Sequence, residues 1–392
     1  MKATIIILSC FFALKTGAQA LQDINYSYLY NPNEKFALHI TPVHSNKAWV
    51  VLYDLRFKTS TDEPLRFVIQ WEKRDALNDK QGVRLTEDSL NIHKSEKGIW
   101  GSISFSEPEA PRIIVAKVVD NEAKQAWMFY KNILPEYPVN GYLMNSNGQP
   151  YLDLFVQNET TFSIGSPANS DRSWIVSYYS DDFPAAAPAF SEGLARVPSI
   201  MKVDSTFTLS PSQKTMYDSA GLYLAQTDTS SKEGFAFRSY YDYPKYSRIE
   251  NLAGPLIYVS TKQEADRLRA AKSDKKSFDR VILSITGDTE RAKSFMRSYF
   301  RQVELANQYF SSYKEGWKTD RGMIYIIFGM PEEVYKFTDR EVWSYKNEVY
   351  KVTFDFVRSP TLFDPDNYVL VRNKKFQETW YQVIDLWRNA RF

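Results

Sequence analysis

Few side chains of this sequence have types and spacings that could support acid–base or metal chemistry. Its three histidines are His39, His44 and His93, and the first two lie five residues apart without a carboxylate motif beside them. Zinc sites use tighter arrangements of histidine, cysteine and carboxylate, so we predict no metal and no cofactor. The carboxylate pairs Asp181-Asp182 and Asp364-Pro365-Asp366 could serve glycoside hydrolysis if the fold separated two carboxylates suitably. Both pairs lie among proline and aromatic residues, where aspartate more often forms turns.

Other signatures of catalysis, and of charged partners, are missing from the sequence. It contains no GxSxG nucleophile motif, no phosphate-binding Walker loop and no dinucleotide-binding glycine pattern. The formal net charge is +2, and removing the first twenty residues takes away Lys2 and Lys15, which leaves 47 basic against 47 acidic residues. This balance argues against nucleic acid or an anionic membrane surface as the partner, because both require clustered positive charge.

The first twenty residues have the pattern of a cleavable export signal. Lys2 is followed by the apolar run 3–14 and by Ala18-Gln19-Ala20, a small-x-small cleavage site. We expect the mature chain to begin at Leu21 and to lie in the periplasm, on the outer-membrane surface or outside the cell. The alternative is a lipoprotein signal with an acylated Cys10, the single cysteine. No segment is long and apolar enough to cross a bilayer, which takes about 20 residues.

The elements that follow are mostly strands. Aromatic residues make up 15% of the chain, and such residues favour pleated, half-buried surfaces. In residues 21–134, segments of strand length predict a β-sandwich-like domain, with strands at 35–40, 48–57, 65–71, 99–105, 112–119 and 126–130. A second β domain is predicted over 135–233, with strands at 151–156, 173–179, 206–209 and 221–225.

Residues 234–392 differ in character and predict an α+β domain. A strand at 256–260 is followed by Thr261-Lys262-Gln263-Glu264, a capping box that begins a helix. Apolar residues spaced by three and four predict a long helix that starts near Asp288 and ends near Tyr313. Further strands are expected at 323–328, 341–345, 350–357 and 368–372, and a last helix at 376–388. The chain is thus predicted as mainly β, with two sandwich-like modules and a C-terminal antiparallel sheet covered by helices.

A distinctive motif lies between the long helix and the strand predicted at 323. Its sequence is Gly316-Trp317-Lys318-Thr319-Asp320-Arg321-Gly322. This stretch resembles the GWxTD domain family, seen in exported proteins of Bacteroidetes and their relatives. The similarity covers roughly residues 240–392 and includes Ala306-Asn307, Glu341-Val342-Trp343 and Trp387-Arg388. The final Trp-Arg lacks the glycine that soon follows it in many members. The family name describes a motif, so the resemblance implies a domain and an exported setting but no reaction.

One interpretation of the motif is structural. Gly316 would end the helix through a positive φ, and Gly322 would let the next strand start close to another backbone. Thr319 and Asp320 would bind neighbouring backbone N–H groups. Trp317 would anchor the corner against the sheet.

A second interpretation of the motif is a binding site. Asp320 and Arg321 would form a polar pair at the mouth of a cleft beside Trp317, which suits a sugar or a peptide. A separate candidate for an aromatic contact surface, serving either sugar faces or packing between domains, consists of Tyr240, Tyr241, Tyr243 and Tyr246.

These observations favour an exported, non-catalytic binding or scaffold protein. We expect its C-terminal domain to contact an envelope protein or polymer. The alternative is a hydrolase of glycans or peptides whose carboxylates come from separate loops.

Overall fold

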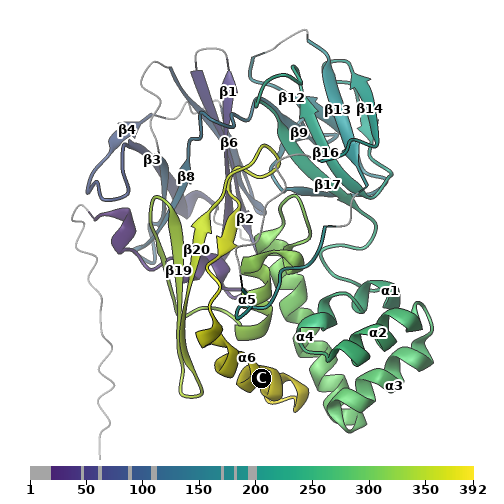
Figure 1. The fold of residues 1–392 in the computed structure, drawn as a ribbon. Coiled ribbons are helices and arrows are strands. Elements are labelled where there is room, and N and C mark those ends of the chain that lie inside the picture. The colour runs from purple at the N-terminus through teal and green to yellow at the C-terminus, as the bar shows by residue number, and fades with distance from the viewer. Residues whose placement is uncertain are drawn as a thin grey trace, which may run out of the picture.

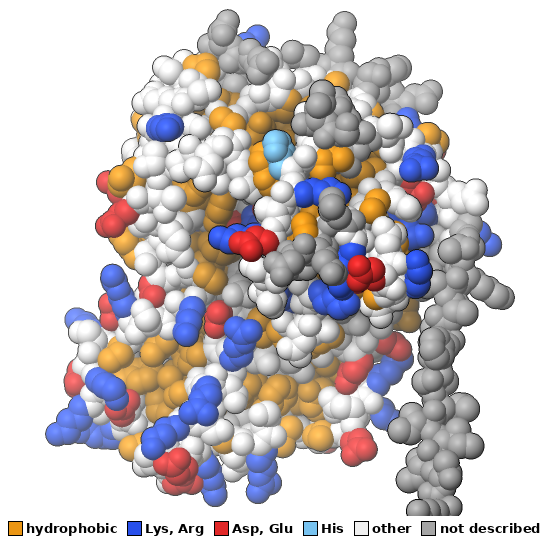
Figure 2. All heavy atoms as spheres, turned by 180° about the vertical axis from the view of Figure 1, so that it is seen from behind, with side chains coloured by type: hydrophobic (Ala, Val, Ile, Leu, Met, Phe, Trp, Pro, Cys, Tyr) orange, Lys and Arg blue, Asp and Glu red, His pale blue; other side chains and the backbone are white. Residues whose placement is uncertain are grey.

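The computed structural model describes residues 19–45, 48–60, 64–86, 91–106, 113–168, 172–180, 183–192 and 201–392. Cys10, residues 1–18 of the predicted export signal and the pair Asp181-Asp182 lie outside the described residues. Figure 1 shows two β-rich modules beside each other, with most of the helices below them. The chain is therefore mainly β, with an α+β part at its C-terminal end, as predicted. Figure 2 shows the opposite face, on which Lys, Arg, Asp and Glu side chains are spread over the helical end.

Two four-stranded antiparallel sheets from residues 36–132 enclose one core. Their strand orders are β1-β2-β6-β5 and β4-β3-β7-β8. The strands are β1 (Phe36–Ser45), β2 (Ala48–Phe57), β3 (Phe67–Arg74), β4 (Val83–Leu85), β5 (Ile92–Ser95), β6 (Gly98–Ser106), β7 (Ile113–Asp120) and β8 (Gln125–Asn132). Alternate residues of a strand enter this core, as Ile114, Ala116 and Val118 of β7 do. The sandwich predicted from the sequence is present, and the short strands β4 and β5 are additional to it.

The second module also consists of two sheets. One has the order β10-β9-β12-β15 and the other the order β11-β17-β16-β13-β14. The strands are β9 (Tyr142–Met144), β10 (Pro150–Tyr151), β11 (Phe155–Gln157), β12 (Thr161–Gly165), β13 (Trp174–Tyr179), β14 (Ser205–Leu209), β15 (Thr215–Met216), β16 (Gly221–Gln226) and β17 (Phe235–Tyr240). The strand predicted at 151–156 is divided between β10 and β11, which lie in different sheets. The boundary predicted at 234 lies between β16 and β17, which are antiparallel neighbours.

The C-terminal part places helices on one face of a four-stranded antiparallel sheet of order β18-β19-β20-β21. Its helices are α1 (Ile249–Leu252), α2 (Lys262–Ala271), α3 (Lys275–Thr286), α4 (Thr289–Phe310), α5 (Asp320–Phe328) and α6 (Gln377–Arg388). Its strands are β18 (Glu333–Lys336), β19 (Arg340–Lys346), β20 (Lys351–Arg358) and β21 (Tyr368–Leu370). The capping box predicted at Thr261 is formed and begins α2. Asp288 caps α4, whose buried stripe runs from Ala292 to Phe310.

Two segments predicted as strands are helical, so those predictions were wrong. Residues 255–258 form a 3₁₀ turn, η5 (Pro255–Tyr258), which has proline at its first position. Residues 323–328 belong to α5, in which every residue except Arg321 is buried. A helix that is apolar on all sides has no amphipathic period, and a short run of branched and aromatic residues then has the pattern of a strand. The burial of α5 explains this error.

The sheet and its helices share a core with residues from other parts of the chain. Phe328 of α5 packs on Phe354 of β20 and on Trp380 of α6, with ring centroids 4.9 and 6.0 Å apart. The same core includes Tyr30 near the N-terminus and Ala189 of the second module. Within the described residues, no helix is long and apolar enough to cross a membrane.

Candidate functional site

The corner between α4 and α5 depends on two glycines that allow backbones to touch. A Cβ added to Gly316 would lie 2.1 Å from the carbonyl oxygen of Ala306, and one added to Gly322 would lie 1.8 Å from that of Gly316. The φ of Gly316 is not positive, and α4 already ends at Phe310. The expected helix stop at Gly316 is therefore wrong, and Gly322 serves a close approach inside a helix instead of a strand start.

Thr319 is the N-cap of α5. Its hydroxyl accepts the backbone N–H of Gly322 at 3.0 Å and donates to the carbonyl of Gly316 at 2.7 Å. A threonine at this position satisfies one of the free N–H groups of the first helical turn. The motif thus turns the chain through a 3₁₀ turn, η6 (Gly316–Lys318), directly into a buried helix.

Trp317 is the aromatic residue of the corner, and only 6% of its surface is exposed. Its indole N–H donates to the hydroxyl of Tyr246 at 2.9 Å, and its backbone N–H donates to the Asn307 side chain at 3.0 Å. The ring packs against Gly254 and, edge on, against Tyr258. Trp317 therefore anchors the corner on the helical side of the domain, whereas the sequence interpretation placed it against the sheet.

Asp320 begins α5 and holds an arginine that follows β21. Its carboxylate oxygens lie 2.5 and 3.2 Å from the two terminal nitrogens of Arg372 and accept the backbone N–H of Leu370 at 2.7 Å. The side chains of Asp320 and Arg372 are only 5% and 2% exposed. Arg321 points elsewhere and pairs with Glu341 at 3.4 Å. The polar pair of Asp320 with Arg321 that a cleft would require is thus not formed.

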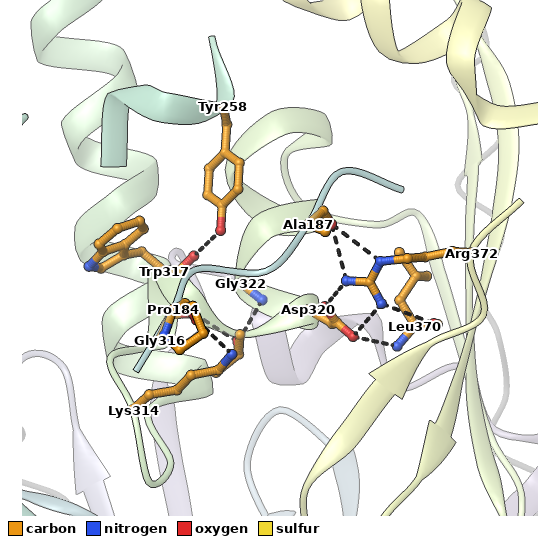
Figure 3. A network of polar contacts seen from close by, with 11 residues as sticks. Pro184, Ala187, Tyr258, Lys314, Gly316, Trp317, Asp320, Gly322, Leu370 and Arg372 are labelled. Carbon is orange, nitrogen blue, oxygen red and sulfur yellow. Dashed lines mark hydrogen bonds and ion pairs between the residues drawn. The ribbon is translucent and has the colours of Figure 1, made fainter. Parts of the chain in front are cut away.

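A segment of the second module crosses this site, and we call residues 183–192 the strap. Arg372 donates to the carbonyl of Ala187 from two nitrogens, at 3.1 and 3.3 Å. The N–H of Ala186 donates to the carbonyl of Lys318 at 3.0 Å, and the N–H of Asn373 donates to that of Ala189 at 3.0 Å. Figure 3 shows the strap passing over the motif beside Arg372. The motif and the end of β21 therefore hold the main chain of another module.

The corner lies inside a region that matches a known family model. The model described as the GWxTD domain matches residues 221–389. The chain is a GWxTD domain-containing protein. No curated protein matches it. The match begins at β16, about twenty residues before the similarity expected from the sequence, so the GWxTD match includes two strands of the second module.

A buried charge cluster lies on the sheet side of the GWxTD domain. Glu341 is fully buried, accepts hydrogen bonds from Tyr30 at 2.5 Å and Trp343 at 2.8 Å, and faces Arg321 and Lys336 at 3.4 and 3.7 Å. Burial alone would raise the pKa of Glu341, but Lys336 and Arg321 hold it below its usual value. Tyr30 belongs to the N-terminal 3₁₀ turn η2 (Ser27–Tyr30). The cluster therefore fastens the start of the described chain to the GWxTD domain.

Asp364 and Asp366, the candidate carboxylates, lie in the loop before β21. Burial, together with the nearby Asp366, raises the pKa of Asp364 to about 6. The pKa of Asp366 is lowered, against the effect of burial, by Lys131 and Arg358. Asp364 also borders a cavity of about 90 Å³ that is lined by all three parts of the chain. Sites for small molecules usually measure about 300 to 1,000 Å³. This cavity is therefore too small for a sugar unit that is linked to other sugars in a glycan.

The four tyrosines proposed as a contact surface are mostly buried. Tyr240 stacks on Tyr243 with centroids 4.1 Å apart, and the hydroxyl of Tyr243 accepts the N–H of Gly316 at 3.0 Å. Tyr246 receives the indole N–H of Trp317. Tyr241 differs from the others, since 57% of its surface is exposed. Tyr240, Tyr243 and the half-buried Tyr246 therefore pack the second module against the GWxTD corner.

The histidines are separate from this site and from each other. His39 lies 3.5 Å from Asp153, His44 lies 3.0 Å from Glu233, and His93 stacks on Trp100 at 3.8 Å. Among the described residues, no group of three or more histidine, cysteine or acidic side chains is placed to hold a metal ion.

Sequence reasoning missed Arg372, the strap and Glu341 as parts of this site. Glu341 was noticed only within the family resemblance, and Arg372 only as the end of a predicted strand. The strap carries one signal in the sequence, because its run of prolines and alanines at 183–188 is typical of a loop. Nothing in its composition indicates which surface it contacts.

Proposed function

We propose that this protein is an exported binding or scaffold protein whose GWxTD domain docks segments of other polypeptides or envelope polymers. The proposal is supported by one main observation: the domain already holds two chain segments from outside the helices and sheet that form it. The motif residues Gly316 to Asp320 are buried. The motif contacts the strap through main-chain groups, since the N–H of Ala186 donates to the carbonyl of Lys318.

The first of these segments is near the N-terminus. The backbone N–H of Tyr26 donates to the carbonyl of Val334 at 2.8 Å, and the side chain of Asn25 accepts the N–H of Val334 at 2.9 Å. Tyr325 donates its hydroxyl to the carbonyl of Tyr30 at 2.8 Å. Two of these contacts use the main chain of the segment, as peptide-binding surfaces do. The buried side chains of Tyr26 and Tyr30 add specificity.

The second segment is the strap, which contacts the chain directly before α5, where the N–H of Ala186 donates to the carbonyl of Lys318. Burial lowers the pKa of Lys314 to about 8, and its ammonium donates to the carbonyl of Pro184 at 3.3 Å. With Arg372, this gives two cationic donors to carbonyl oxygens of one extended segment. Charged donors make stronger hydrogen bonds than neutral ones, so a segment needs few side-chain contacts to be held.

Cross-linking in envelope preparations tests the proposal. The full-length protein would be expressed with its first twenty residues, its mature N-terminus sequenced, and its partners captured by photo-cross-linking and mapped by mass spectrometry. We expect an N-terminus at Leu21 and cross-links concentrated in residues 221–389. An unprocessed protein in the cytosolic fraction would refute the exported setting, and cross-links confined to the two β modules would refute the role of the GWxTD domain.

The hydrolase alternative has one specific observation in its favour. Asp364 and Asp366 have pKa values shifted in opposite directions, which is the pattern of an acid and its partner carboxylate. Against it, Asp366 is paired with both Lys131 and Arg358. Assays on envelope glycans and peptides with wild type, Asp364→Asn and Asp366→Asn decide between the two functions. Turnover that is lost in the Asp364 variant would establish the hydrolase.

A further inference from the structure

Along residues 183–189 of the strap, every third residue is buried. Phe183, Ala186 and Ala189 are buried, whereas Pro184 and Ala187 are exposed. A strand would alternate every two residues and an α-helix every three to four, but a polyproline II helix has three residues per turn. The backbone of 183–188 has no regular secondary structure, and prolines at 184 and 188 restrict φ to the value that this helix needs. The strap then ends in a turn, in which the N–H of Ser191 donates to the carbonyl of Pro188, so the polyproline II segment is 183–188.

The surface beneath the strap has the form that such a segment requires. At one end, Phe183 meets Tyr313 edge to face with centroids 5.0 Å apart. At the other end, Phe190 contacts Trp380 and Tyr381 of α6 at 6.1 and 5.4 Å. Aromatic rings on a groove are the usual partners of polyproline II ligands. The two ends are thus fixed by rings.

Between the ends, the groove contacts the main chain and excludes large side chains. Ala186 and Ala189 are only 7% and 0% exposed, so a larger residue at either position would clash. Carbonyl oxygens of the strap accept from Lys314, Arg372 and the backbone of Asn373, as described above. Polyproline II segments form no internal hydrogen bonds, which leaves the carbonyls of Pro184 and Ala187 available. Specificity therefore rests on small residues at two positions three apart.

We infer that this surface of the GWxTD domain is a binding groove for polyproline II segments, with the strap as its resident ligand. A partner polypeptide that carries small residues three apart between two aromatic residues enters the same groove when the strap leaves it. This inference rests on the proposed docking function and specifies the chemistry of the partner. A tethered strap competes at an effective concentration on the order of millimolar, so free peptide binds the intact protein weakly.

Peptide titration of strap variants tests the inference. The probe is a fluorescent octapeptide with the sequence of residues 183–190, and the first host is the full-length mature protein with Ala186→Asp and Ala189→Asp, which expels its own strap. We expect this host to bind the probe at least about ten-fold more tightly than wild type does, because the tethered competitor is gone. Adding Arg372→Ala should weaken that binding about ten-fold, as expected for loss of a charged donor. Arg391→Ala, an exposed arginine of the same domain, is the matched control and should leave it unchanged.

A second host variant keeps the test decisive if the first variant does not fold. Pro184→Gly with Pro188→Gly loosens the strap without altering its buried side chains, and it should bind the probe about three-fold or more tightly than wild type. A probe carrying aspartate at the positions of Ala186 and Ala189 should bind neither host. Equal binding of both probes, or a probe affinity no higher than that of wild type in any folded host, would refute the inference that this surface is a polyproline II groove. Cross-links to residues 221–389 that persist after that result would leave the docking function standing.

Discussion

The carboxylate of Asp320 binds the guanidinium of Arg372 through both oxygens, and the same guanidinium donates to the carbonyl of Ala187 in the strap. The acidic residue of the motif therefore acts on the second module through an intermediary. It fixes the orientation of Arg372, while the N–H of Leu370 fixes the carboxylate. Leu370 therefore positions Asp320, Asp320 positions Arg372, and Arg372 contacts the strap.

Removing Asp320 should be strongly destabilising. Asp320→Ala leaves a guanidinium that is 2% exposed without its counter-ion, and loss of one partner from a buried pair costs about 3 to 5 kcal/mol. Asp320→Asn keeps one acceptor and should cost less, although more than the roughly 1 kcal/mol expected of a simple helix cap. Urea unfolding of the full-length variants measures both. The double variant Asp320→Ala with Arg372→Ala should cost less than the sum of the single variants, and strict additivity would show that the pair is not coupled.

Gly322→Ala should destabilise the protein although it improves helix propensity. Alanine in place of glycine inside a helix gains about 1 kcal/mol, but the new Cβ would lie 1.8 Å from the carbonyl oxygen of Gly316. Overpacking costs about 1 to 3 kcal/mol, and an approach of 1.8 Å to a backbone atom belongs at or above the top of that range. After the gain in helix propensity we therefore expect a net loss of about 2 kcal/mol. Thermal unfolding is the measurement. Gly148→Ala is the control, because it meets no atom within 4 Å and carries only the strain of its positive φ. A Gly322→Ala protein as stable as wild type would disprove the close approach.

Trp317→Ala should lower the melting temperature by several degrees, since truncation of a buried aromatic residue costs about 3 to 5 kcal/mol. Trp317→Phe separates packing from polarity. It fills most of the space but removes the indole N–H that donates to Tyr246, so it should cost about 1 to 2 kcal/mol. Unchanged melting with lost partner cross-links would identify Trp317 as a contact residue instead.

The parts of this domain that the sequence predicts well are those decided by neighbouring residues. The capping box at Thr261 and the apolar stripe of α4 depend on spacings of three and four, and both were found. By contrast, α5 has no polar face, so its pattern could not distinguish helix from strand. The local signal for a helix start is the N-cap residue Thr319 followed by the acidic Asp320, which the strand prediction did not use.

The site was only partly predictable because its contacts join distant residues. Asp320 was singled out from the motif, but its partner Arg372 is 52 positions away, and Arg372 in turn meets Ala187 at a separation of 185. Side-chain types alone do not reveal such pairings, since the same aspartate would suit a turn equally well. Tyr240 and Tyr243 of the Tyr-rich run are buried against the corner, and this burial depends on the position of Gly316, which no local pattern shows.

Tyr243→Phe should destabilise the corner, whereas Tyr241→Phe should not. Without the Tyr243 hydroxyl, the buried N–H of Gly316 loses its acceptor, and an unsatisfied buried donor costs about 1 to 3 kcal/mol. Tyr241 is exposed and donates to the carbonyl of Asp218, so its variant should stay within about 0.5 kcal/mol of wild type. Chemical denaturation of this matched pair is the measurement. If the Tyr243 variant instead lost glycan binding at unchanged stability, the tyrosines would form a contact surface.

Asp364→Asn should stabilise the protein at neutral pH and not in acid. The folded-state pKa of Asp364 is raised to about 6 from an ordinary value of 3.8, so the folded protein holds a proton that the unfolded chain releases between pH 4 and 6. Its contribution to stability is therefore lost as pH rises through that window. Asparagine carries no charge and still accepts the N–H of Asp366, so the variant should be about 1 to 3 kcal/mol more stable at pH 7 and equal to wild type near pH 3.5. Comparing the two proteins in urea from pH 3.5 to 8 cancels the opposite effect of Asp366, whose pKa is lowered. A difference that is constant across this range would mean that Asp364 is not protonated in the fold.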